Sequence, residues 1–188
     1  MNIVLQRGVI MSNRKTILYI SMSLDGFIAD QYHQVSWIEG EDKNHNGDYG
    51  YSEFIKTIDT VILGNRTYRQ IITELSPNEW VYQDLTSYVF TNEKVKDTAN
   101  IKFVRENIKT FIEKLKKQEG KDIWICGGSD IVNQCIKNNL IDEYRITIVP
   151  IILGKGLRLF NNDHSLIKLK WKDVKQENGL LECIYVKK

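Results

Sequence analysis

The segment 124–160 constrains the fold of this chain more than any other, because it reads as a strand, a glycine pair, a helix and a second strand in succession. Two strands joined by a helix need a crossover connection, which is typical of a parallel sheet. Gly127 and Gly128 permit close approach of the backbone to a ligand, and the helix start after them presents free N–H groups and a partial positive charge. A phosphate or pyrophosphate would suit this position. A tight turn without any ligand explains the same residues equally well, since a short glycine motif is a weak signal.

The composition is that of one ordinary globular domain. A chain of 188 residues can bury a substantial core, and its shares of 42% hydrophobic and 27% charged residues are average. The formal net charge of +2 is too small to favour a nucleic-acid-binding protein. No segment resembles a signal peptide or a membrane span, so we expect a cytoplasmic protein without membrane association.

The cysteines and histidines predict neither disulfides nor a metal centre. Cys126, Cys135 and Cys183 have no CxxC spacing, and each lies in an apolar pattern, so we expect buried, reduced thiols. The three histidines are scattered without ligand spacing, and no metal site is predicted.

The first residues are interpreted as an extension. Residues 1–12 precede a single domain that we place at 13–188. Arg7, Gly8 and Val9 can be encoded by a purine-rich run similar to a bacterial ribosome-binding site, which makes Met11 a candidate for the natural start.

Strands and helices alternate along the chain. Strands are predicted at 16–22, 60–63, 86–91, 101–104, 122–126 and 143–149, with helices at 51–58, 64–74, 108–115 and 129–139. The C-terminal part differs, because 167–174 and 180–186 alternate around Asn178-Gly179, a strong signal for a hairpin. The expected fold class is therefore α/β, a mixed and mostly parallel sheet flanked by helices, closed by a C-terminal antiparallel hairpin.

Polar and small residues follow three of the predicted strands. These groups are Gly64-Asn65-Arg66-Thr67, Thr91-Asn92 and Gly127-Gly128-Ser129. Ligands of open α/β sheets bind beyond the carboxyl ends of the strands, so the three groups predict one elongated anionic ligand such as a dinucleotide. The GxGxxG fingerprint and the GxxxxGK[ST] phosphate loop are both absent, which calls for a different nucleotide-binding fold.

Five segments together resemble the dihydrofolate reductase-like superfamily, and within it the C-terminal reductase domain of the bifunctional riboflavin-biosynthesis deaminase-reductase in a small stand-alone bacterial form. The segments are SMSLDGFIAD (21–30), DTVILGNRTY (59–68), YVFTN (88–92), ICGGSDIVNQCI (125–136) and LIDEYRITIVPIILGKGLRLF (140–160). They occur in the expected order over nearly the whole chain.

The resemblance implies a three-layer fold, NADPH as the hydride donor and a homodimer, for which the edge strand of the C-terminal hairpin is a ready pairing surface. It further implies that Gly127, Gly128 and Ser129 hold the cofactor pyrophosphate with help from Thr67. By the same resemblance, Thr91 and Asn92 would lie near the adenosine, and Ala29 would border the nicotinamide.

One departure from the family pattern concerns the cofactor. Relatives usually have Gly-Arg-x-Thr, whereas this chain has Gly64-Asn65-Arg66-Thr67, so an amide replaces the usual cation for the 2′-phosphate and an arginine follows it. If Arg66 took over this role, its loss would raise the dissociation constant of NADPH more than that of NADH. Asp130, in the first turn of the predicted helix, suits the helix dipole but would oppose a bound phosphate.

The proton donor is the second open point. Dihydrofolate reductases place a carboxylate after the loop tryptophan, and Asp42 lies at a comparable distance after Trp37, within a long polar loop at 31–51. Asp48, Tyr49 and Tyr51 compete for the same role. Asp25 is a further candidate, although an Asp-Gly pair after a strand more often forms a turn. Trp37 would either stack on a flat heterocycle or anchor the loop.

The expected activity is hydride transfer from a reduced nicotinamide to a C=N or C=O carbon of a small heterocyclic or sugar-derived substrate. The reductase step of riboflavin biosynthesis is the nearest comparison, although the HxE and PCxxC motifs of a deaminase are absent. Two alternatives stay open, a dihydrofolate reductase proper and a non-catalytic NADPH-binding protein.

Overall fold

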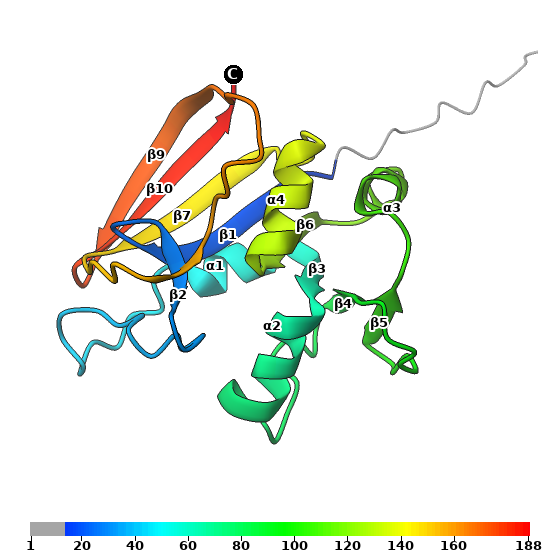
Figure 1. The fold of residues 1–188 in the computed structure, drawn as a ribbon, viewed down its shortest axis with the longest axis horizontal. Coiled ribbons are helices and arrows are strands. Elements are labelled where there is room, and N and C mark those ends of the chain that lie inside the picture. The colour runs from blue at the N-terminus through cyan, green and yellow to red at the C-terminus, as the bar shows by residue number, and fades with distance from the viewer. Residues whose placement is uncertain (1–13) are drawn as a thin grey trace, which may run out of the picture.

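The computed structural model describes residues 14–188, so the predicted extension at 1–12 lies outside the described residues. An eight-stranded sheet has the strand order β5-β4-β3-β6-β1-β7-β10-β9 (Figure 1). Its strands are β1 (Thr16–Ser23), β3 (Ile58–Gly64), β4 (Thr86–Phe90), β5 (Ile101–Val104), β6 (Asp122–Gly127), β7 (Glu143–Val149), β9 (Leu169–Glu177) and β10 (Leu180–Lys187). A separate ribbon pairs β2 (Phe27–Asp30) with β8 (Gly156–Arg158). The helices are α1 (Tyr51–Lys56), α2 (Asn65–Gln70) with its π-helical continuation η1 (Ile71–Leu75), α3 (Ile108–Leu115) and α4 (Ser129–Lys137).

The sheet is parallel from β5 to β7 and antiparallel from β7 to β9. This confirms the predicted mixed, mostly parallel sheet with a C-terminal hairpin. Asn178 and Gly179 both have positive φ, 46° and 79°, as the tight turn between β9 and β10 requires. The carboxyl ends of the parallel strands share one edge of the sheet, and the predicted ligand-binding groups follow them there.

Helices cover both faces of the sheet, because its central strands are apolar on both sides. On one face, the predicted stripe of α3 packs with α4 against Leu18, Ile62 and Ile125. On the other face, Phe54 of α1 and Ile71 of η1 pack against strand residues of β1, β3 and β6. The chain therefore has the three layers that the family resemblance implies.

Several predicted boundaries and one burial assignment are wrong. α4 ends at Lys137 instead of 139, and β9 runs over Leu169–Glu177 instead of 167–174, since ends of elements depend on packing more than on pattern. The three-residue strand β8 was not predicted, because it forms only by pairing with β2. Cys135 is buried, whereas Cys126 at the cleft and Cys183 on the open hairpin are partly exposed, contrary to the expectation for all three thiols.

The hairpin leaves apolar side chains uncovered on one face. Trp171 and Val174 of β9 are 62% and 46% exposed, and Leu181 of β10 is 37% exposed. The register pairs Trp171 with Tyr185 and Val174 with Cys183, which places these side chains on the same side of the sheet. We call Trp171, Val174 and Leu181 the hairpin patch.

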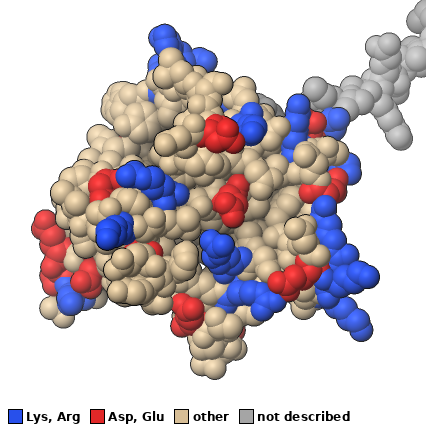
Figure 2. Space-filling model, viewed as in Figure 1, with Lys and Arg blue, Asp and Glu red and all other residues tan. Residues whose placement is uncertain are grey.

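The surface is mixed in charge. On the face drawn in Figure 2, lysines and arginines are interspersed with aspartates and glutamates. Among residues 14–188, no helix has the length and apolar character needed to cross a bilayer.

Replacing Ile125 tests the central strand. Ile125 lies on β6, which pairs with β1 and β3, and its side chain is fully buried. Ile125→Ala should therefore leave a cavity and lower the free energy of unfolding by about 2–5 kcal/mol. Leu166→Ala, at a residue that is 86% exposed, should change it by less than about 0.5 kcal/mol. Urea denaturation measures both, and equal effects would contradict the assigned core.

Candidate functional site

One cleft of about 1140 Å³ runs along the carboxyl ends of the parallel strands. Its lining brings together nearly all residues predicted for the cofactor: Ala29, Gly64, Asn65, Arg66, Thr67, Thr91, Asn92, Gly128 and Ser129. Gly127 ends β6 directly beside this lining. Residues from four separate strand ends thus share one elongated space, as the sequence reasoning required.

The cleft has few side chains where β3 and β6 end, because Gly64, Gly127 and Gly128 lie there. A Cβ added to Gly64 would lie 3.2 Å from Ile131 and 3.9 Å from the backbone nitrogen of Gly128, and one added to Gly128 would lie 3.2 Å from the Thr67 hydroxyl. The peptide bond between Gly127 and Gly128 is cis, and Gly127 has a φ of 123°. The starts of α2 and α4 therefore approach each other backbone to backbone, a cradle that a larger residue would fill.

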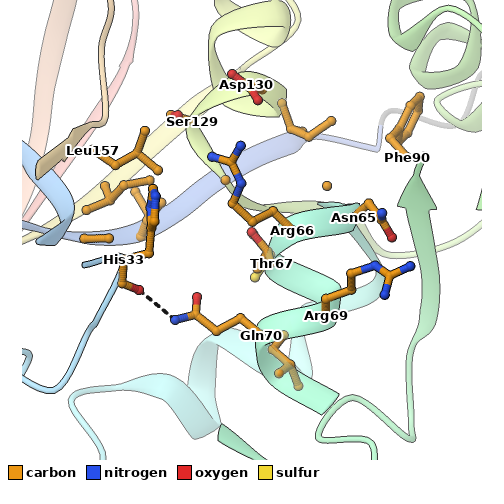
Figure 3. A pocket seen from close by; sticks show the side chains of 18 of the residues that line it. His33, Asn65, Arg66, Thr67, Arg69, Gln70, Phe90, Ser129, Asp130 and Leu157 are labelled. Atoms are coloured by element: carbon orange, nitrogen blue, oxygen red, sulfur yellow. Dashed lines mark hydrogen bonds between the residues drawn. The ribbon is translucent and has the colours of Figure 1, made fainter. Parts of the chain in front are cut away.

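The start of α4 presents polar groups that the described residues leave free. No side chain caps the helix at Gly128. Ser129 is only 7% exposed, yet its hydroxyl has no hydrogen-bond partner among residues 14–188 and borders the cleft. Figure 3 shows the Arg66 guanidinium extending from α2 toward Ser129 and Asp130. Free N–H groups, a hydroxyl and a guanidinium around a glycine cradle fit a pyrophosphate, and Asp130 of the same helix also lines the cleft.

The end of the cleft beside β4 is organised around a carboxylate that the sequence analysis did not single out. Glu93 accepts a hydrogen bond from Asn65 Nδ2 at 2.9 Å and an ion pair from Arg69 Nη2 at 2.5 Å. Arg105 donates to the Glu93 carbonyl oxygen from Nε at 3.1 Å and Nη2 at 2.7 Å. The Arg69 hydrogen bond, with help from Asn65, holds the pKa of Glu93 below its usual value, so the carboxylate is ionised and paired with the Arg69 guanidinium.

The opposite end is bordered by β1, β2 and the loop after β2. Ala29 is buried in β2, with Tyr19 and Ser21 of β1 nearby in the lining. Gln70 of α2 donates to the His33 carbonyl oxygen at 2.8 Å, which ties the loop to the helix across the cleft (Figure 3).

A second recess of about 420 Å³ continues from this end and shares Tyr19, Ser21 and Ile38 with the cleft. Its floor also includes Thr147 of β7, and its roof is the loop at 38–49. The strand register places Ser21, Thr147 and Glu182 in one row across β1, β7 and β10. The floor is therefore polar, in contrast to the apolar core under the helices.

The roof of the recess is tied to the C-terminal hairpin. His45 Nε2 lies 2.7 Å from Glu177 Oε1, and Asn178 Nδ2 donates to Tyr49 Oη at 2.8 Å. Asn178 also pairs with the backbone of Asp42, accepting from its N–H at 2.8 Å and donating to its carbonyl oxygen at 3.0 Å. The same Asn178 that makes the hairpin turn thus positions the loop.

The three residues predicted for catalysis are not brought together. Asp42 lies on the second recess, whereas Asp25 and Trp37 are in neither lining. Asp25 accepts from the Ser23 hydroxyl at 2.6 Å and from the N–H of Gly154 at 2.7 Å, and these bonds lower its pKa. Trp37 donates from Nε1 to the Gln34 carbonyl oxygen at 3.1 Å, a contact within the loop itself. These contacts match the structural alternatives for Asp25 and Trp37.

The competing loop residues also differ in position. Asp48 and Tyr49 lie on the second recess, whereas Tyr51 begins α1 and is outside both linings. Hydrogen bonds from Ser52 and from the backbone N–H of Gly50 hold the pKa of Asp48 below its usual value. Asp48 is therefore an ionised acceptor at neutral pH.

Sequence reasoning missed two titratable groups beneath the recess. Burial, with the nearby Glu182 charge, raises the pKa of Tyr19 to about 12, so its hydroxyl stays protonated at neutral pH. Glu182 is 7% exposed, and burial raises its pKa against the opposing effects of Arg145 and Lys175. A charged residue at an inward position of the alternating strand 180–186 was the available signal.

The fold is that of a dihydrofolate reductase-like protein. The dihydrofolate reductase of Enterococcus faecalis, solved with NADP(H), superposes with a TM-score of 0.60 at 15% identity over 94% of this chain and 98% of that one, which shows the shared fold. Residues 14–179 match the family model of the RibD C-terminal domain, so the chain belongs to that family. Reductase domains of this family typically bind NADPH.

Three proteins illustrate the similarity within the family. YwjB of Bacillus subtilis (strain 168), an uncharacterized protein, is 41% identical over 93% of this chain and 98% of its own length. A structure from Shewanella sp. PV-4, provisionally assigned to riboflavin biosynthesis, has a TM-score of 0.81 at 25% identity, covering 93% and 99% of the two chains. The Thermotoga maritima diaminohydroxyphosphoribosylaminopyrimidine deaminase/5-amino-6-(5-phosphoribosylamino)uracil reductase shares the fold, with a TM-score of 0.69 at 16% identity over 93% of this chain and 57% of that one.

The raised pKa of Glu182 makes a prediction for stability. A carboxyl group whose pKa is higher in the folded than in the unfolded chain stabilises the fold fully only below the unfolded pKa, and that contribution is lost as the pH rises through the folded pKa. Glu182→Gln should therefore be more stable than the natural chain at pH 8, and the difference should shrink toward zero in acid. Denaturation across this pH range measures it, with Glu113→Gln on the exposed side of α3 as the control. A variant that is less stable at pH 8 would show that the Lys175 and Arg145 charges dominate.

Proposed function

We propose that this protein is a reductase that transfers a hydride from a reduced nicotinamide dinucleotide, NADPH in the family pattern, to a C=N or C=O carbon of a small polar substrate. The substrate class is heterocyclic or sugar-derived, similar to that of 5-amino-6-(5-phosphoribosylamino)uracil reductase. The observation that carries this proposal is the single cleft in which the glycine cradle, the unpartnered Ser129 hydroxyl and the Arg66 guanidinium converge.

The residues of the chain would bind and orient the dinucleotide. The N–H groups at the start of α4, the Ser129 hydroxyl and Arg66 would hold the pyrophosphate. The adenosine would extend toward Thr91 and Asn92, and the nicotinamide toward Ala29. When bound, the cofactor supplies the hydride, and the protein contributes alignment and exclusion of water.

The second recess is the proposed substrate site, because it opens from the nicotinamide end of the cleft. Its polar floor of Tyr19, Ser21 and Thr147 suits hydroxyl and amide groups. Tyr19 stays protonated and can donate a hydrogen bond, and ionised Asp48 can accept one. Asp42, on the rim, remains the proposed proton donor.

We also propose that two copies associate through the hairpin patch. An edge strand with exposed Lys170, Lys172 and Lys175 resists pairing edge to edge, so the exposed apolar face is the better contact than the edge itself.

Removing the Arg66 guanidinium tests the pyrophosphate site. Arg66→Ala should raise the dissociation constants of NADPH and NADH alike by about 10- to 100-fold, because the pyrophosphate is common to both and a charged hydrogen bond is worth about 1.5–3 kcal/mol. Calorimetric titration measures both constants. Lys109→Ala, at an exposed residue of α3, is the control and should bind as the natural chain does.

A substrate screen then separates catalysis from binding alone. Loss of reduced-nicotinamide absorbance that depends on a phosphoribosylaminopyrimidine, on dihydrofolate or on another carbonyl compound would assign the reaction. Tight dinucleotide binding without turnover would instead support the non-catalytic alternative. No heat with any nicotinamide dinucleotide would reject the proposed function.

A single charge tests the hairpin patch. Trp171→Glu should shift the protein from dimer to monomer in sedimentation velocity, because a carboxylate would be buried against an apolar partner surface. Leu166→Glu, at a more exposed site outside the patch, is the control. A natural chain that sediments as a monomer would exclude the dimer.

A further inference from the structure

Glu93 accepts a hydrogen bond from Asn65, the position at which relatives usually have an arginine. The side chain follows β4 and is oriented by its own backbone, since Glu93 N–H donates to Thr91 Oγ1 at 3.1 Å. Its two carboxylate oxygens are shared between two side chains of α2, Asn65 at 2.9 Å and Arg69 at 2.5 Å. The carboxylate is therefore oriented toward α2, although its side chain is 47% exposed.

The place of Glu93 along the cleft identifies what it would face. The pyrophosphate cradle lies at the ends of β3 and β6, and Ala29 lies to one side of it on β2. Glu93, Thr91 and Asn92 lie to the other side, beyond β4. A dinucleotide with its nicotinamide at Ala29 must therefore place its adenosine ribose at the Glu93 end.

The charges at this end favour a hydroxyl over a phosphate. A ribose 2′-hydroxyl can donate to a carboxylate, whereas a 2′-phosphate is repelled by it. The two arginines nearby are already engaged, Arg69 with the Glu93 carboxylate and Arg105 with its carbonyl oxygen. Arg66 extends the other way, toward Ser129, while Asn65 and Arg69 extend toward β4 (Figure 3). A 2′-phosphate would have to compete with the Glu93 carboxylate for Arg69.

We infer that Glu93 is a specificity-determining residue that selects a dinucleotide with a free ribose 2′-hydroxyl, so that this protein binds NADH at least as tightly as NADPH. The inference rests on the proposed function and deepens it, since family members typically bind NADPH. Asn65 is part of the same device, because its amide supports the carboxylate where relatives would have a cation for the phosphate.

The test compares the two reduced dinucleotides on the natural chain and on Glu93→Gln by calorimetric titration. The natural chain should bind NADH as well as or better than NADPH. Glu93→Gln removes the negative charge, keeps the shape and releases Arg69, so the NADPH dissociation constant should fall about tenfold, about 1.4 kcal/mol. The NADH constant should rise or stay unchanged, because an amide is a weaker acceptor than a carboxylate. Glu113→Gln, the same charge change on α3, should leave both constants unaltered.

Two fragments isolate the ribose end from the rest of the cofactor. Adenosine 2′,5′-bisphosphate should gain affinity on Glu93→Gln, and 5′-AMP should not. Circular dichroism of the variant establishes that it is folded, and raised salt should reduce the gain for the bisphosphate, as expected for a charge effect.

The outcomes separate this inference from the proposed function. A natural chain that prefers NADPH, together with a variant whose NADPH to NADH ratio is unchanged, would overturn the role of Glu93 and leave the reductase assignment standing. Equal weakening of both dinucleotides by Glu93→Gln would also overturn it, because Glu93 would then only support the cleft. Binding of neither dinucleotide to the folded natural chain would reject both proposals.

Discussion

The approach of two backbones at the ends of β3 and β6 is the constraint on which the candidate site depends. A Cβ on Gly64 or on Gly128 would lie 3.2 Å from its nearest neighbour, so any side chain at these positions would crowd Ile131 or Thr67 where α2 and α4 start side by side. That contact directs the Thr67 hydroxyl, the Arg66 guanidinium and the free end of α4 into the same space. The remaining site residues extend from this point along the sheet edge in both directions.

The architecture was predictable because it depends on patterns that are local in the sequence. Apolar strands, the stripe of α3 and the Asn178-Gly179 turn each specify one element, and the alternation of elements specifies a parallel sheet. The convergence of the three strand-end groups followed from that topology alone. What the pattern could not supply was β8, since three residues form a strand only when β2 is already in place beside them.

The substrate side was less predictable because its contacts join segments that are far apart in the chain. The roof loop is positioned by Asn178 and by Glu177, more than a hundred residues later. Asp25 was a candidate for catalysis although an Asp-Gly pair more often forms a turn, and its bonds to Ser23 and Gly154 fit the turn. The sequence shows Glu182 as a charged residue at an inward strand position, but only the strand register places it in one row with Ser21 and Thr147.

Asn65 and Glu93 belong together, because their side chains are hydrogen-bonded at 2.9 Å. Considered alone, Asn65 removes the usual cation and would only weaken the binding of a 2′-phosphate. Glu93 changes that reading, because its carboxylate would be destabilised beside an unpaired 2′-phosphate but is stabilised by a neutral amide donor and one arginine. An arginine at position 65 would add a second cation to a pair that is already balanced. In the proposed role the amide and the carboxylate act together, and this end of the cleft would suit a hydroxyl donor better than a phosphate.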